Sequence, residues 1–314
     1  MLWVTWRQHR WQIVGGAALV LAYCGFLLYV GADGHRAIAE CLRVVSTDVA
    51  PPACVRANRL YNALTGVMLA GSLLPLTVGV FWGAPMVSRE FEQGTYRLTF
   101  TQSIGRGRWL LTKTAVLAVA AAVLGSSIGI SVLWSVNRFA PMFESRVFGD
   151  PVAFAQAGLV PAGAWVLSLA TGVLIGAVAR RVTVAMALTL IVLALFSIGL
   201  TAIRPYYFPA SDIVLGGASM FPDPSPVAGR SGWLRSISYV DSSGRELSSR
   251  EAGAICDDPG NTYPTADCLN RHELLQQVSY HPAGRYVWFQ LAELSLLLAG
   301  AAAAVAAARW SLER

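Results

Sequence analysis

Charged residues are scarce in this chain of 314 residues: they make up 13% of the sequence, whereas hydrophobic residues make up 55%. A soluble domain carries about 25% charged residues, so the composition excludes an ordinary soluble protein and favours an integral membrane protein. Lysine is scarcer still, because Lys113 is the only one. The net charge of +6 therefore comes from arginine, and its distribution, given below, indicates membrane topology and no nucleic-acid partner.

The sequence also lacks the motifs of an ATPase or an intramembrane enzyme. A phosphate-binding loop of the form GxxxxGK[ST] needs glycines ahead of its lysine, and Lys113 follows Trp-Leu-Leu-Thr. The four histidines all fall outside the apolar runs, and His272-Glu273 has Gln276 where a zinc protease needs its second histidine. We expect no catalytic residue, metal ion or cofactor in this chain, although an enzyme remains a minor alternative.

Six apolar runs are long enough to cross a membrane, which takes roughly 20 residues each. They predict an all-α integral membrane protein with spans at residues 13–30, 60–82, 109–136, 155–179, 182–203 and 286–308. The short turn Arg180–Arg181 makes the fourth and fifth spans antiparallel neighbours. Three glycine pairs with GxxxG spacing permit close helix contact, which we expect within one chain: Gly79–Gly83, Gly125–Gly129 and Gly172–Gly176.

The basic residues predict the orientation of these spans. With the N-terminus inside, the inner segments hold eleven basic and three acidic residues, whereas the outer segments hold thirteen and fourteen. This bias satisfies the positive-inside rule. We therefore expect a multi-pass protein of the bacterial inner membrane whose N-terminus and tail, residues 309–314, are cytoplasmic.

Residues 1–12 precede the first span and carry tryptophan and arginine, which suit a helix lying in the membrane interface. The alternative is a signal peptide cleaved near Ala37-Ile38-Ala39, but the apolar run is longer than a usual signal sequence. We expect an uncleaved first span.

Four cysteines fall in segments predicted to be outside the cell, while Cys24 lies within the first span. Local pairing on the oxidising side predicts the bridges Cys41–Cys54 and Cys256–Cys268. Unpaired thiols, or bridges between the two segments, remain alternatives.

The segment at residues 204–285 is predicted to form a small extracytoplasmic cap held by one bridge. Asp241-Ser242-Ser243-Gly244 follows a short apolar stretch and reads as a hairpin turn. A helix capped by Asp267 is expected from Cys268 to about Ser279.

Glu293 lies about seven residues into the last span, so roughly 10 Å deep at 1.5 Å per residue. An ionisable group at that depth is a functional candidate, and Gln290 shares its helix face. Glu293 could line a substrate path, form a structural pair with Arg204, or remain a protonated carboxyl.

The inner loop at residues 86–104 carries both charge signs and two short helical patterns, which suits docking to another protein. We expect Pro85 to end the second span and Ser88 to cap a new helix with Glu90 and Glu92 in its first turn. Gly94 then breaks it. A plain loop anchored by its arginines is the alternative.

This loop resembles that of the ABC-2 type permeases, the type V exporters. The residues that carry the resemblance are Arg89, Glu90, Glu92, Gly94, Thr95, Leu98, Thr101-Gln102-Ser103, Arg106, Arg108-Trp109-Leu110 and Lys113. The opening Trp3 and Trp6-Arg7-Gln8 and the segment before the last span are similar to actinobacterial members. Close motif matches cover about 60 residues, whereas the six-span pattern covers the full chain.

The resemblance implies a permease that exports an amphipathic or hydrophobic cargo. Its partners would be a separate ABC ATPase that carries ATP and Mg, a second permease chain, and the lipid bilayer. Residues at the ATPase contact would be Glu90, Glu92, Gly94, Thr95, Tyr96 and Arg97. A sensory or scaffolding protein that binds a ligand through its cap is the alternative function.

Overall fold

The computed structural model describes residues 2–44, 51–94, 105–143, 147–215, 232–256 and 266–313. Six helical stretches in it are long and apolar enough to cross a membrane. They are residues 9–43, 52–92, 107–139, 160–179, 182–206 and 283–313. The predicted number of spans and their order are confirmed.

Five of the six helical stretches extend beyond the predicted spans, because hydrocarbon-facing and water-facing turns can belong to one continuous hydrogen-bonded helix, whereas the fourth begins at residue 160 and not at 155. The first, α1 (Leu2–Val44), shows no break at residue 12 and carries Cys41 in its last turns. It is followed by α2 (Pro52–Gly71) and α3 (Leu74–Val78). The later long helices are α6 (Arg106–Phe139), α8 (Val160–Ala179), α9 (Val182–Ile203) and α13 (Tyr286–Glu313).

The second span does not end at Pro85, contrary to the prediction. A π-helical turn, η1 (Gly79–Gly83), leads directly into α4 (Ala84–Glu92), where proline occupies the first turn. Proline there lacks the N–H that a continuous α-helix would use, and the wider preceding turn accommodates it. Ser88 therefore caps nothing; its hydroxyl donates to the Ala84 carbonyl inside the helix.

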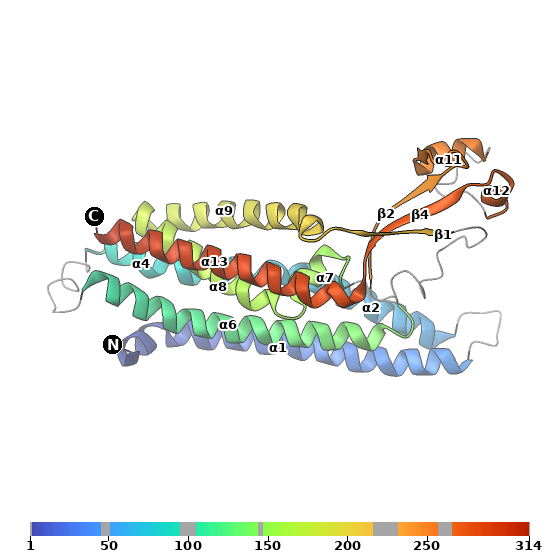
Figure 1. Cartoon of the computed structure of the whole chain (residues 1–314). Coiled ribbons are helices and arrows are strands. Elements are labelled where there is room, and N and C mark those ends of the chain that lie inside the picture. Colours follow the sequence, from blue (N-terminus) through green and yellow to red (C-terminus); the bar gives the residue numbers. More distant parts are fainter. Residues whose placement is uncertain are drawn as a thin grey trace. The chain divides into compact units, whose positions relative to one another are not determined.

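The chain divides into two compact units. The first comprises residues 1–143, 151–204 and 289–314, and therefore contains most of the helices. Within it α1 lies beside α2 and α6, and α8 contacts α6, α9 and the η1–α4 segment (Figure 1). The tight turn between α8 and α9 has Arg180 in the left-handed conformation (φ 54°), so the predicted antiparallel pair is confirmed.

Glycine pairs bring the helices of this first unit into backbone contact. A methyl group at Gly79 would lie 2.6 Å from the Ser168 carbonyl oxygen, and one at Gly172 would lie 2.7 Å from the Ala84 nitrogen. The pairs Gly79–Gly83 and Gly172–Gly176 thus face each other, and a methyl group at Gly125 would lie 2.6 Å from the Pro161 carbonyl. All three GxxxG pairs serve packing within the chain.

The second unit comprises residues 144–150 and 205–288 and contains a four-stranded antiparallel sheet of order β1-β4-β2-β3. Its strands are β1 (Ser211–Leu215), β2 (Trp233–Val240), β3 (Glu246–Leu247) and β4 (Leu275–His281). Two short helices, α11 (Ser249–Ile255) and α12 (Ala266–Arg271), pack with β2 and β3 around a small hydrophobic core. That core contains Tyr239, Leu247, Ala252, Leu269 and Leu274.

One local prediction for this unit is confirmed and one is wrong. The Asp241 carboxylate accepts hydrogen bonds from the Ser243 and Arg245 amides, which forms the predicted hairpin turn between β2 and β3. The hydrogen bond from the Ser243 hydroxyl lowers the pKa of Asp241 and keeps it ionised. The helix expected from Cys268 to Ser279 ends at Arg271, and the remainder is strand β4, paired on both sides by β1 and β2.

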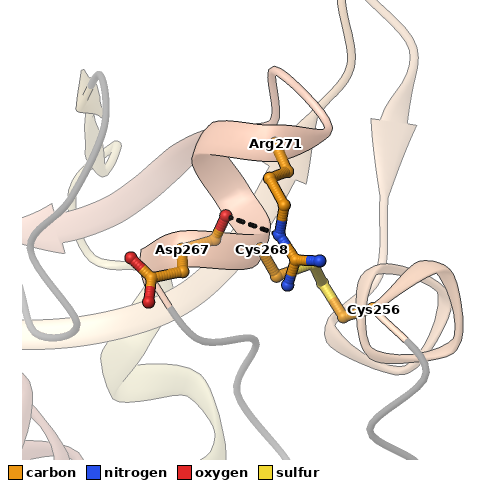
Figure 2. The surroundings of a disulfide bond; sticks show 4 residues. All are labelled: Cys256, Asp267, Cys268 and Arg271. Carbon is orange, nitrogen blue, oxygen red and sulfur yellow. Dashed lines mark hydrogen bonds between the residues drawn. A yellow bond between two sulfur atoms is a disulfide. The ribbon is translucent and has the colours of Figure 1, made fainter.

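Both expected disulfides are present, and each joins two helical segments. Cys41 in α1 is bonded to Cys54 in α2, and Cys256 after α11 is bonded to Cys268 in α12. Figure 2 shows the second bridge, with the Arg271 side chain donating to the Asp267 carbonyl across one turn of α12. Each bridge closes a short loop and is worth about 3 kcal/mol in the chain-entropy description.

The glycine contacts generate a stability prediction. Gly172→Ala places a methyl group against the backbone of α4, so we expect the free energy of unfolding to fall by about 1–3 kcal/mol. Gly199→Ala in α9 meets nothing within 4 Å and serves as the matched control. Thermal unfolding in detergent checks both variants; equal melting temperatures would show that the α4–α8 contact tolerates expansion.

Candidate functional site

The carboxylates of Glu90 and Glu92 lie at the end of a transmembrane helix rather than at the start of a new one. Glu90 and Glu92 occupy the last turn of α4, and Gly94 ends the helix in the left-handed conformation (φ 67°). The other three predicted contact residues, Thr95, Tyr96 and Arg97, lie outside the described residues.

Glu90 is turned inward and paired. Its carboxylate lies 2.6 Å from Lys113 Nζ, and the two side chains are only 17% and 8% exposed. The Lys113 ammonium also lies 4.5 Å from the centre of the Trp109 ring, a cation–π geometry. The only lysine of the chain therefore ties α4 to α6, a role that the sequence pattern alone did not indicate.

Glu92 is exposed and ties α4 to a different helix. Its carboxylate accepts a hydrogen bond of 3.0 Å from the amide of Val182, the first residue of α9. A negative charge at a helix N-terminus is favourable because it meets the unpaired amides and the positive end of the dipole. Arg180 in the neighbouring turn lies over the Phe91 ring, 5.2 Å from its centre. The end of α4 is thus linked to α6, to the α8–α9 turn and to α9.

Glu293 forms a buried ion pair with Arg204. Two hydrogen bonds of 2.7 and 2.8 Å join the guanidinium to both carboxylate oxygens, and the side chains are 1% and 4% exposed. The guanidinium also donates to the Pro151 carbonyl and lies 4.4 Å from the centre of the Phe154 ring. Glu293 was expected to line a substrate path, to pair with Arg204 or to remain a protonated carboxyl, and the structure has it paired with Arg204.

Gln290 also has a structural position. Its side-chain oxygen accepts hydrogen bonds from the amides of Leu159 and Val160, at 2.9 and 3.2 Å, where α8 begins. Its nitrogen donates to the Phe154 carbonyl at 3.4 Å. Gln290 therefore caps the N-terminus of α8. It accepts hydrogen bonds from backbone amides that would have no acceptor in hydrocarbon.

A second buried amide, Gln156, links three helical segments and was not anticipated from the sequence. It is the last residue of α7 (Pro151–Gln156), and its side chain is buried, with 4% of the residue exposed. Its oxygen accepts from the Tyr23 hydroxyl at 2.8 Å, and its nitrogen donates to the Met68 carbonyl. A polar side chain in an apolar run was the available signal, since such groups need partners in a membrane.

Among the described residues of the second unit, His281 is the titratable group with the least exposure. His281 is fully buried between aromatic rings, and this burial lowers its pKa so that it is neutral at pH 7. Within the described part of the chain, no group of three His, Cys, Asp or Glu side chains could hold a metal ion.

The buried pair generates a prediction about stability. Glu293→Gln leaves Arg204 buried without a counter-charge, so we expect a loss of about 3–5 kcal/mol of unfolding free energy. Replacing both residues, by Arg204→Met and Glu293→Leu, removes the uncompensated charge and should restore most of that stability. Thermal unfolding in detergent measures both; a single variant as stable as the double would mean that the pair is not energetically coupled. The exposed substitution Glu246→Gln is the control.

Comparison with known protein families agrees with a multi-pass membrane protein. A family model described as "ABC-2 membrane transporter related" matches residues 17–204, which cover most or all of each of the first five membrane-spanning stretches and include the α4 carboxylates. No curated protein and no solved structure is detectably similar to the chain. Since the match covers more than half of the sequence, this multi-pass protein belongs to the ABC-2 membrane transporter related family.

Proposed function

We propose that this chain is the permease subunit of an ATP-driven exporter whose ATPase is a different polypeptide. The observation that supports this most is the position of the end of α4. There the exposed Glu92 is bonded to α9, and the inward-facing Glu90 is paired with Lys113 of α6. A movement of this end of α4 would therefore move α6 and α9 directly through these contacts. The family match and the lack of a phosphate-binding loop in this sequence agree with such a division of labour.

In this proposal the end of α4, together with the residues that follow it up to 104, docks on the ATPase. Its displacement is passed to α6 through the Glu90–Lys113 pair and to α9 through the Glu92–Val182 hydrogen bond. Rigid-body movement of these helices would open a path for an amphipathic or hydrophobic cargo. The two termini are cytoplasmic, the second unit is extracytoplasmic, and a second permease chain completes the transporter.

Purification tests the partner directly. The chain, affinity-tagged and extracted in mild detergent, should retain an ATPase with phosphate-binding motifs in roughly one-to-one ratio, as identified by mass spectrometry. Glu92→Lys should lower the recovered ATPase activity by about tenfold or more, because reversing an interfacial charge costs on the order of 1.4 kcal/mol or above. Glu246→Lys, in an exposed strand of the second unit, should leave it unchanged.

The Glu90–Lys113 pair allows a charge-swap within the same experiment. Glu90→Lys should reduce ATP hydrolysis by the purified complex, and adding Lys113→Glu should recover part of it, since the pair is rebuilt in reverse. No recovery in the swapped variant, with normal folding, would place the role of Glu90 in a contact other than Lys113. Absence of any ATPase from wild-type preparations would reject the exporter proposal.

Protease accessibility tests the proposed orientation. A cleavable tag after Arg314 should be protected from protease added to intact cells, whereas a tag inserted at Gly244, in the exposed β2–β3 turn, should be cut. Both disulfides would then lie on the oxidising side. Cleavage of the tag after Arg314, with the tag at Gly244 protected, would show that the orientation is the reverse of the one proposed.

A further inference from the structure

An apolar groove lies among α6, α8 and α13, all within the first unit. Its volume of about 490 Å³ falls in the range of small-molecule sites. Half of its lining is alanine, contributed by all three helices: Ala115, Ala118, Ala170, Ala301, Ala302 and Ala306. Small side chains on three neighbouring helices leave a channel where larger ones would have filled the space.

The groove runs along α13 and is open at its side. Along α13 it runs from Leu298 to Arg309, which is about 16 Å at 1.5 Å per residue. Leu298 and Leu111 at its walls are 45% and 41% exposed, so it faces the surface of the helical unit. On a membrane-spanning surface, the surrounding medium is hydrocarbon.

The groove has a charged residue at one end and a buried hydroxyl farther along its wall. Arg309 lies at that end, in the last turns of α13, against Gly107 in the first turn of α6. Its Nε donates to Glu313 at 2.7 Å, but both side chains are about half exposed, and such a pair contributes little to stability. Thr114 also lines the groove; it is 5% exposed, and its hydroxyl has no hydrogen-bond partner among the described residues.

We propose that this groove binds one acyl chain of an anionic phospholipid from the leaflet in which Arg309 lies. The chain follows the alanines toward Leu298, and the phosphate lies against the Arg309 guanidinium. A cation at the interfacial end of an apolar channel is complementary to this ligand and to its direction. The site goes beyond the transport proposal, because it requires neither an ATPase nor a cargo.

The size of the groove favours an acyl chain over a helix of a second copy. A helix is about 10 Å across with its side chains, so it would pack against such a groove with one face only. A single acyl chain is much thinner. The charge at the end of the groove has no counterpart on an apolar helix.

Lipid retention tests the site in the full chain. The protein is reconstituted in nanodiscs of phosphatidylglycerol and phosphatidylcholine, washed in detergent, and its bound phospholipid is counted by mass spectrometry. The wild type should retain about one phosphatidylglycerol per chain. Ala306→Trp should reduce retention by about tenfold or more, because the indole fills the groove and removes the van der Waals contacts that hold the acyl chain there. The control is Ala307→Trp, because Ala307 is also exposed but does not line the groove. This variant should retain phosphatidylglycerol as the wild type does.

A second variant separates the headgroup from the acyl chain. Arg309→Gln should reduce the preference for phosphatidylglycerol over phosphatidylcholine by about fivefold, whereas exposed Arg181→Gln should not. Equal retention by the two tryptophan variants, or an unchanged preference in Arg309→Gln, would overturn the proposal. So would a dimer that dissociates in Ala306→Trp while lipid retention stays constant, because the groove would then be a protein interface.

Discussion

Hydrocarbon offers no hydrogen bonds, and this constraint accounts for the arrangement of polar groups in the helical unit. The backbone must be satisfied inside helices, and every side chain that interrupts the apolar runs needs a partner from the protein. Gln290 caps the amides that begin α8, Gln156 joins a tyrosine and a carbonyl on two other segments, and Glu293 meets Arg204 with both oxygens. Each of these contacts fixes one helix end or crossing, so the few polar residues specify how the spans fit together.

Backbone contact between spans follows from the same constraint. Lipid tails are as apolar as leucine, so burial of large side chains gives little reason for helices to associate, and close packing has to supply the attraction. The glycines of η1 and α8 allow this by removing the side chains that would separate the two backbones. The π-helical turn at Gly79–Gly83 and Pro85 then direct α4 past the Arg180–Arg181 turn, where Glu92 reaches the first amide of α9.

The sequence predicted the spans, the tight α8–α9 turn and the β2–β3 hairpin, because each is encoded in neighbouring residues. Apolar length, an arginine pair between two apolar runs and an Asp-Ser-Ser-Gly stretch are local signals. The failures at Pro85 and after Arg271 share a cause: tertiary contacts overrode local propensity. Proline usually stops a helix, but the contacts with α8 hold η1 and α4 in line, and the residues after Arg271 pair with two strands distant in sequence.

Glu90 illustrates why a resemblance names residues better than it assigns their contacts. The pattern of the inner loop placed Glu90 and Glu92 together as charges available to a partner. Their spacing of two residues on a helix, however, puts them about 200° apart, since each residue turns the helix by about 100°. One must therefore face the spans when the other faces outward. Lys113, approaching from α6, makes the inward position tenable by neutralising Glu90 within hydrogen-bond distance, so a single helical turn carries both an exposed charge and an internal tether.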